Sequence, residues 1–215
     1  MASGAKTVRV AVATIFLSGA YYATKTQEEG FTTTPVIPVQ GDRPTIGFGS
    51  TFYEDGRPVK MGDPAITRER AWRIVAAHNA REEAEFRATL NGVLLFQQEY
   101  ELFFDWRYQY GINAWKSGGI LRNLKAGKRV QACKSILEYK FMTSNRTQAA
   151  PGWQVSKRDS AGRPIQWRYD CSTPGNKVCY GVHARNLRRH DSCMSYALAD
   201  EMPVPSGTLT AGGLQ

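Results

Sequence analysis

Two short stretches near the N-terminus combine the residue types that cleavage of a polysaccharide requires. The first is Glu28-Glu29-Gly30, and the second is Pro44-Thr45-Ile46-Gly47-Phe48-Gly49-Ser50-Thr51. Glycosidic cleavage needs a carboxylic acid beside the sugar and a polar group that places a water molecule. Glu29 could supply the acid, and Thr45 could hold the water. A Glu-Gly pair alone more often marks a solvated helix end, but this pair and the glycine-punctuated run together indicate a sugar-cleaving site.

These stretches resemble the phage-type lysozymes, family 24 of the glycoside hydrolases, and especially the endolysins of phages of Gram-negative hosts. In that family a Glu-Gly pair closes the first helix, and a Thr-Ile-Gly-aromatic-Gly turn follows in a small β lobe. Three later stretches are similar to its central helix, its helix-turn-helix and its last helix, respectively 98–111, 118–133 and 181–193. The four blocks follow the family's order over most of residues 25 to 195.

The resemblance implies an α+β fold that is mainly α, with the substrate cleft between a small β lobe and a helical lobe. It implies a muramidase that cleaves peptidoglycan between N-acetylmuramic acid and N-acetylglucosamine, for host cell lysis by a phage, without a cofactor or a metal. Glu29 matches the family's catalytic acid, and Thr45 and Asp42 are the other catalytic candidates. The candidate substrate-binding residues are Phe48, Asn113 and Trp115. We expect the last two in a loop after the central helix.

One position departs from the family's pattern, which places an Asp or Cys nine residues after the catalytic Glu and six before the Thr. Counting forward from Glu29 reaches Pro38, and counting back from Thr45 reaches Val39. Neither side chain can do acid–base chemistry. The nearest carboxylate, Asp42, either reaches the site or only caps the turn. The reaction stays open between hydrolysis and a lytic transglycosylase reaction, in which the sugar's own hydroxyl attacks and a second carboxylate is not needed.

The N-terminus has the composition of an export signal. Lys6 and Arg9 precede an apolar run from Val10 to Ala23, which is shorter than the roughly 20 residues that span a bilayer. Residues 1–24 are either cleaved near Ala23 or kept as a signal-anchor-like segment of the signal-arrest-release type. A retained segment would tether the enzyme transiently to the inner membrane and later form part of the first helix. The closeness of Glu29 to Ala23 favours retention, and an ordinary first helix of a cytosolic protein is the alternative.

We expect a lysozyme domain over residues 25–199, with the β lobe at about 31–63 and an inserted hairpin at about 143–180. Residues 200–215 are rich in Pro, Ser, Gly and Thr and predict a flexible tail. Thr67 is the expected N-cap of a helix that reaches about Leu90. Further helices are expected at 96–110, ending at Gly111, at 120–126 with Ser117 as N-cap, at 128–142 and at 183–198.

The cysteines indicate an oxidising compartment. The chain has four cysteines and no Cys-x-x-Cys pair, which argues against a zinc site and is compatible with two disulfides. We expect Cys133 to pair with Cys193 and Cys171 with Cys179, and four reduced thiols are the alternative. A formal net charge of +9 favours an anionic partner, which could be nucleic acid, an anionic membrane surface or a bacterial wall.

Three classes of function compete for this sequence. The first is the peptidoglycan-cleaving glycosidase, acting as a monomer in the host periplasm. The second is a virion-associated wall-binding or structural protein with weakened catalysis, for which the missing carboxylate is the best support. The third is a basic nucleic-acid binder, but no recognition motif accompanies its charge. We therefore expect bacterial peptidoglycan, and no nucleic acid, as the partner.

Overall fold

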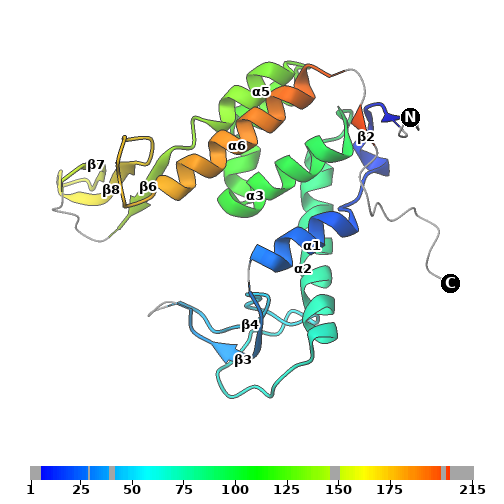
Figure 1. The fold of residues 1–215 in the computed structure, drawn as a ribbon. Helices are drawn as coiled ribbons and strands as arrows, with labels where there is room; N and C mark the ends of the chain where they lie inside the picture. The colour runs from blue at the N-terminus through cyan, green and yellow to red at the C-terminus, as the bar shows by residue number, and fades with distance from the viewer. Residues whose placement is uncertain (1–5, 29, 39–41, 146–150, 200–201, 204–215) are drawn as a thin grey trace. The chain divides into compact units, whose positions relative to one another are not determined.

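The computed structural model describes residues 6–28, 30–38, 42–145, 151–199 and 202–203 of this chain. It combines helices with small antiparallel sheets, so the mainly helical α+β fold expected from the sequence is confirmed (Figure 1). The chain divides into two compact units. The first unit contains residues 1–112 and 200–215, and the second contains residues 113–199.

The described part of the first unit begins and ends in short strands. Its elements are β1 (Lys6–Thr7), β2 (Val10–Ala11), η1 (Val12–Thr14), α1 (Gly19–Glu28), β3 (Thr32–Val36), β4 (Thr45–Gly47), α2 (Arg68–Thr89), β5 (Leu94–Leu95), most of α3 (Gln97–Ser117) and β9 (Met202–Pro203). Antiparallel pairs join β1 to β9, β2 to β5 and β3 to β4. Residues 202–203, within the expected tail, form β9, and their backbone pairs with β1.

Two helix boundaries follow local signals in the sequence. The hydroxyl of Thr67 accepts a hydrogen bond from the Arg70 N–H at 3.2 Å, which confirms Thr67 as the N-cap of α2. Gly111 breaks the helical backbone of α3 with φ 83° and ψ 161°, as expected. The helix resumes at once, however, and continues to Ser117. The expectation that Asn113 and Trp115 lie in a loop is therefore wrong.

The apolar N-terminal run belongs to the core of the first unit. Its buried apolar side chains are Val12, Ile15, Leu17 and Tyr21. The rings of Tyr21 and Phe104 form a T-shaped pair with centroids 5.8 Å apart, and Phe104 in turn contacts Phe86 on α2 at 5.5 Å. Among the described residues, no helix is both long enough and apolar enough to cross a membrane.

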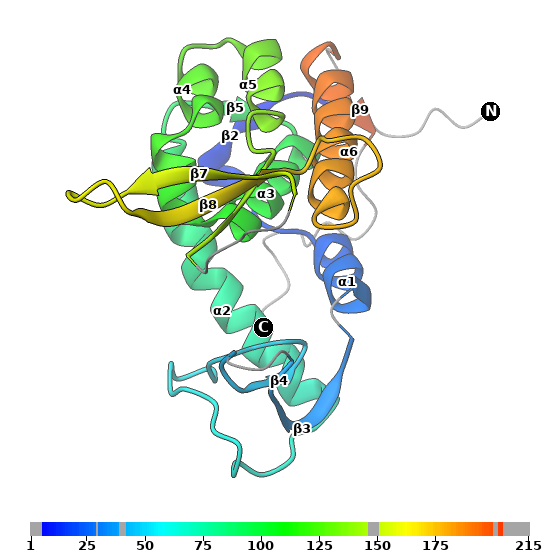
Figure 2. The ribbon, with the colours of Figure 1, turned by 90° about the vertical axis from the view of Figure 1, so that its left-hand side faces the viewer.

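The second unit contains three helices and a three-stranded sheet, which follow the end of α3 in the sequence. Its elements are α4 (Gly119–Lys125), α5 (Arg129–Ile136), β6 (Phe141–Ser144), β7 (Trp153–Arg158), β8 (Pro164–Asp170) and α6 (Tyr180–Ala197). The sheet has the antiparallel order β6-β8-β7, with the β7–β8 hairpin at one side (Figure 2). The hairpin was expected from the sequence, whereas β6 was not.

The helix expected at 128–142 is too long, because the end of this range forms a strand. Helix α5 ends at Ile136, and Phe141, within the range of the expected helix, begins β6 with a partly exposed ring. The reason is non-local, because β6 takes its hydrogen bonds from β8 almost thirty residues later. The expected cap of α4 also differs. Gly118 occupies the N-cap position, and the Ser117 hydroxyl donates to the Asn113 carbonyl at 2.8 Å.

The expected cysteine pairing is confirmed. The Cys133–Cys193 disulfide joins α5 to α6 across 60 residues. The Cys171–Cys179 disulfide closes a short loop between the end of β8 and the N-cap of α6. No cysteine is free.

Candidate active site

Glu29 itself lies outside the described residues, but the backbone on both sides of it is described. Helix α1 ends at Glu28. Gly30 follows with φ 69°, a left-handed conformation that glycine adopts without the steric cost of a side chain. The glycine of the Glu-Gly pair thus allows the chain to turn directly from α1 toward β3.

Thr45 opens β4 opposite Val36 of β3. Its side chain is half-buried, and its hydroxyl donates to the Val36 carbonyl in a long contact of 3.4 Å. Asp42 lies three residues earlier in a bend and is exposed. The structure therefore anchors Thr45 within the β3–β4 pair, whereas no described contact fixes the Asp42 carboxylate.

The run that follows Thr45 attaches the β lobe to α2. Gly47 has φ 66°, and a Cβ atom at this position would lie 2.8 Å from the Ala71 Cβ on α2. Only glycine therefore permits this approach. Phe48 is buried between the rings of Phe31 and Trp72, with centroids 5.4 and 5.3 Å away. This packing fixes the turn that carries residues 49–52.

A pocket with a cavity volume of about 80 Å³ lies within the first unit. Helices α1, α2 and α3 and the turn after β4 all contribute to it. Its lining consists of Tyr21, Phe48, Gly49, Ser50, Thr51, Phe52, Val75, His78, Asn79 and Tyr108. Aromatic rings beside hydroxyl and amide groups suit a sugar, which offers an apolar ring face and a rim of hydroxyls. The two chain segments that flank Glu29 in sequence, α1 and the β lobe, both supply parts of this wall.

Two titratable side chains of the pocket, His78 and Tyr21, favour their neutral forms. Burial, with the charges of Arg81 and Arg107, holds the pKa of His78 below its usual value. Burial, with a smaller contribution from the Asp105 carboxylate, raises the pKa of Tyr21. Near neutral pH the imidazole is therefore uncharged and the phenol keeps its proton. Such a wall can donate and accept hydrogen bonds without attracting ions, as a sugar-binding surface requires.

The three expected sugar contacts are placed differently from one another. Phe48 contributes to the pocket wall in the first unit. Trp115, in the second unit, is fully buried and offers no ring face for stacking on a sugar, so the expected contact is corrected to a core role. Asn113 is exposed on α3.

Sequence reasoning missed most of the pocket wall. Tyr21 lies in the signal-like run, and His78 is a lone histidine on a helix, so neither residue carries a sequence signal for a sugar site. Tyr108 is a partly exposed aromatic residue inside a helix dense in aromatics, so its sequence carried no separate signal. Ser50 and Thr51 could have been found, because they directly follow the glycine-punctuated turn. Over the described ranges, no group of His, Cys, Asp and Glu side chains is arranged to hold a metal ion.

Comparison with known proteins identifies the family. A family model described as phage lysozyme matches residues 26–158, a range that includes the Glu-Gly pair, Thr45 and the turn after β4. No curated protein matches the chain.

Solved structures of the same kind share the fold. An endolysin from Escherichia coli O157:H7 phage FAHEc1 is 21% identical with a TM-score of 0.58, over 84% of this chain and 94% of that one. A mutant of P22 lysozyme is 20% identical with a TM-score of 0.54, over 84% and 99%. The muramidase domain of SpmX from Asticaccaulis excentricus is 17% identical with a TM-score of 0.54, over 86% and 99%. The chain therefore belongs to the phage lysozyme family, and it is a glycoside hydrolase of the lysozyme type that acts on peptidoglycan.

Proposed function

We propose that this enzyme cleaves the glycan between N-acetylmuramic acid and N-acetylglucosamine, with Glu29 as general acid, during host cell lysis by a phage. The observation that carries the proposal is the family match over residues 26–158, which contains Glu29 and the Thr45 turn in the expected order. The neutral, aromatic pocket of the first unit supports it, because that pocket suits a sugar ring.

In the proposed reaction, Glu29 gives its proton to the bridging oxygen as the glycosidic bond breaks. Water then attacks the opposite face of the sugar, oriented by Thr45 with help from Asp42. The half-buried position of Thr45 in the β3–β4 pair supports a fixed orienting role. Phe48 and the residues around it would hold the sugar, and exposed Asn113 remains a candidate contact.

A lytic transglycosylase reaction is the second candidate. It is favoured by Pro38 and Val39, which occupy the positions where the family pattern has a carboxylate or thiol. Without a partner that activates water, a hydroxyl of the substrate itself would attack and leave an anhydro sugar. Glu29 would then be the only catalytic carboxylate.

The test is loss of turbidity of purified Gram-negative peptidoglycan sacculi with wild type, Glu29→Gln and Glu28→Gln. Glu28→Gln is the matched control, because it removes the same charge one residue earlier. A general acid contributes about 100-fold or more to rate, so only Glu29→Gln should lose that much. Equal losses in both variants, or an active Glu29→Gln, would remove Glu29 from the mechanism.

Mass spectrometry of the released muropeptides separates the two reactions. Reducing ends indicate hydrolysis, and anhydro ends indicate transglycosylation. Two further variants, Asp42→Asn and Thr45→Val, test the groups that place the water. If both lose activity, hydrolysis needs both side chains; if only Thr45→Val loses activity, Asp42 only caps the turn. If wild type releases nothing under either reducing or oxidising conditions, the alternative of a wall-binding virion protein replaces the enzyme's proposed role in lysis.

We also propose that the protein works as a monomer in the host periplasm, after its N-terminal segment has left the inner membrane. The support is that Val12, Ile15, Leu17 and Tyr21 are core residues of the first unit. The same side chains cannot lie in a bilayer and in this core at once. N-terminal sequencing of the periplasmic and membrane fractions tests this: a product starting after Ala23 in the periplasm would refute retention.

A further inference from the structure

The charge of this chain is strongly segregated between its two units. Residues 113–199 hold 16 Lys and Arg against 4 Asp and Glu, a formal charge of +12. The remaining residues hold 12 Lys and Arg against 15 Asp and Glu, a formal charge of −3. The positive net charge of the chain therefore comes entirely from the second unit, so attraction to an anionic surface would act on that unit.

The β7–β8 hairpin of the second unit has an apolar face that is only partly covered. Alternation along β8 places Tyr169 and Trp167 on one face, with Trp153 opposite Tyr169 and Val155 opposite Trp167. The pairing is irregular beyond Val155, and Ile165 lies in this irregular part of the hairpin. Tyr169 is buried and Trp167 is half-buried, whereas Ile165 is 40% and Val155 38% exposed. The apolar side chains are thus covered at the base of the hairpin and more exposed toward its free end.

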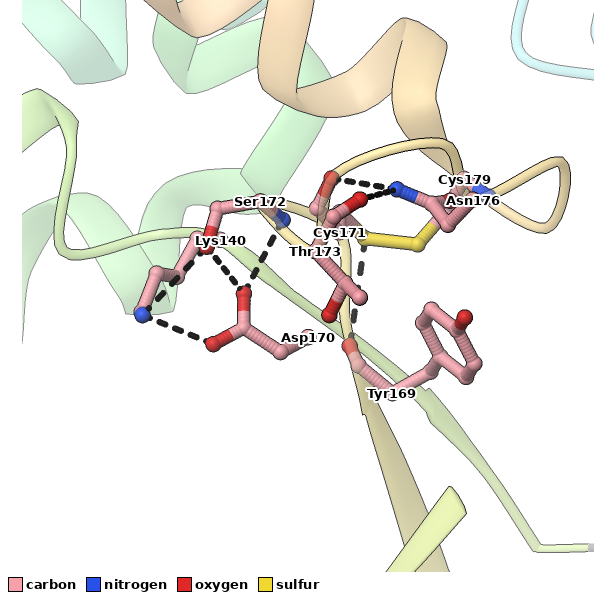
Figure 3. Close-up of polar contacts among 8 residues, drawn as sticks. All are labelled: Lys140, Tyr169, Asp170, Cys171, Ser172, Thr173, Asn176 and Cys179. Atoms are coloured by element: carbon pink, nitrogen blue, oxygen red, sulfur yellow. Dashed lines mark hydrogen bonds and ion pairs between the residues drawn. A yellow bond between two sulfur atoms is a disulfide. The ribbon is translucent and has the colours of Figure 1, made fainter. Parts of the chain in front are cut away.

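The base of this hairpin is firmly fastened. Asp170, at the end of β8, accepts hydrogen bonds from Lys140 Nζ at 2.7 Å and from the Ser172 N–H at 2.9 Å (Figure 3). The Asn176 side chain ties the loop between Cys171 and Cys179, since its amide donates to the Cys171 carbonyl at 2.9 Å and its oxygen accepts from the Cys179 N–H at 3.0 Å. The exposed outer half of the hairpin therefore extends from a base that hydrogen bonds and the Cys171–Cys179 disulfide hold in place.

The free end carries cations around an ordered turn. Arg158 donates to the Gly162 carbonyl at 2.8 Å, and Arg163 pairs with Asp159 at 2.8 Å. Exposed Lys157, next to Arg158 on β7, adds one further positive charge near this end. Figures 1 and 2 both show this end of the hairpin extending away from α4, α5 and α6. Exposed apolar side chains of the hairpin therefore lie beside a cationic turn.

From these features we propose that the β7–β8 hairpin docks the second unit on an anionic phospholipid surface. Val155 and Ile165 enter the interface, and Arg158 and Arg163 lie against lipid phosphates. A lipid surface offers both parts of the match, since interfacial segments combine buried apolar side chains with basic residues near anionic headgroups. A hydrated glycan would satisfy only the charge. This binding goes beyond the proposed sugar cleavage and does not depend on it.

The experiment measures partition of the full-length oxidised protein onto vesicles of phosphatidylethanolamine with phosphatidylglycerol, and onto vesicles of phosphatidylcholine alone. Two double variants test the hairpin. Arg158→Gln with Arg163→Gln removes the tip cations, and Val155→Thr with Ile165→Thr removes apolar surface while keeping β-branched side chains. The matched control, Lys60→Gln with Arg73→Gln, removes two exposed cations from the first unit.

We expect wild type and the first-unit control to bind the anionic vesicles equally, more weakly in high salt, and to leave the neutral vesicles unbound. The cation variant should bind about tenfold or more weakly, and the apolar variant several-fold more weakly. Thermal unfolding of both should stay close to wild type, because all four side chains are exposed and a surface contact such as the Arg163–Asp159 ion pair contributes less than about 1 kcal/mol. Equal vesicle binding by all proteins, no vesicle binding by wild type, or weaker retention of the hairpin variants only on insoluble peptidoglycan would overturn the proposal.

Discussion

A buried carboxylate on α2 holds the start of the helix that leads to Glu29. Glu83 is only 5% exposed, and its Oε1 accepts hydrogen bonds from the Leu17 N–H at 2.8 Å and the Tyr100 hydroxyl at 2.9 Å. It also forms an ion pair with Arg87 at 3.3 Å. Ser18, the residue after Leu17, donates its N–H to the Glu101 carboxylate at 2.9 Å. Two carboxylates therefore bind consecutive backbone amides directly before α1.

Replacing Glu83 by Gln keeps the shape and removes the charge. Hydrogen bonds to a charged group contribute about 1.5–3 kcal/mol and neutral ones about 0.5–1.5 kcal/mol. With the donors of Leu17, Tyr100 and Arg87 sharing one oxygen, we expect a loss of about 2 kcal/mol in the free energy of unfolding. For a chain of this size that lowers the melting temperature by roughly 4–8 °C. Peptidoglycan cleavage should fall further than stability alone explains, because α1 loses its fixed start.

Calorimetry gives the melting temperature, and hydrogen exchange of the Leu17 and Ser18 amides reports the local effect. A loss of 2 kcal/mol corresponds to about 30-fold faster exchange if the start of α1 opens locally. The control is Glu85→Gln on the same helix, whose carboxylate is 43% exposed and for which an ion pair contributes less than about 1 kcal/mol. If Glu83→Gln melts like Glu85→Gln, or if its Leu17 amide stays as protected as in wild type, the reasoning about the carboxylate fails.

Three further predictions follow from other contacts. Replacing Cys133 and Cys193 by Ser removes a crosslink that spans 60 residues, and the lost loop-closure entropy should lower the free energy of unfolding by about 4 kcal/mol. Calorimetry without reductant measures this loss. A reductant that lowers the melting temperature of the variant as much as that of wild type would contradict the prediction. Partial burial opposes ionisation of Asp170, but Lys140 and the Ser172 hydrogen bonds outweigh the burial and lower the pKa of Asp170 to about 2. The stability that the Asp170 carboxylate contributes should be complete above about pH 4 and be lost as the pH falls through 2. The melting temperatures of wild type and Asp170→Asn should therefore converge in acid. Val75→Phe should fill the pocket and slow peptidoglycan cleavage with little change in melting temperature, and unchanged cleavage would mean that the substrate does not use this pocket.

Local sequence signals were sufficient where a structure depends on near neighbours. The hydroxyl of Thr67 caps α2 because the backbone amides it serves lie within the next turn. Gly111 interrupts α3 because its own backbone adopts a left-handed φ. The β7–β8 hairpin was visible as two β-rich runs around a turn, and its strands pair as expected.

Signals failed where distant segments decide the outcome. Phe141 looks like an inward residue of a helix, yet pairing with β8 makes its segment a strand. Trp115 looks like a sugar-stacking residue after a glycine, yet it is buried completely inside the second unit. Neither result depends on the neighbours of these residues in sequence.

By itself, the sequence determined the family, the mainly helical α+β fold and the candidate acid at Glu29, because spaced motifs such as Glu-Gly and the Thr45 turn remain readable without coordinates. Tertiary structure alone decided the pocket wall, in which Tyr21, His78 and Tyr108 come from three different helices. Only the tertiary structure shows that the Glu83 carboxylate accepts a hydrogen bond from the Leu17 N–H, 66 residues earlier and directly before α1. The physical reason is that motifs and caps are local, whereas a pocket and a buried carboxylate are created only when distant segments pack together.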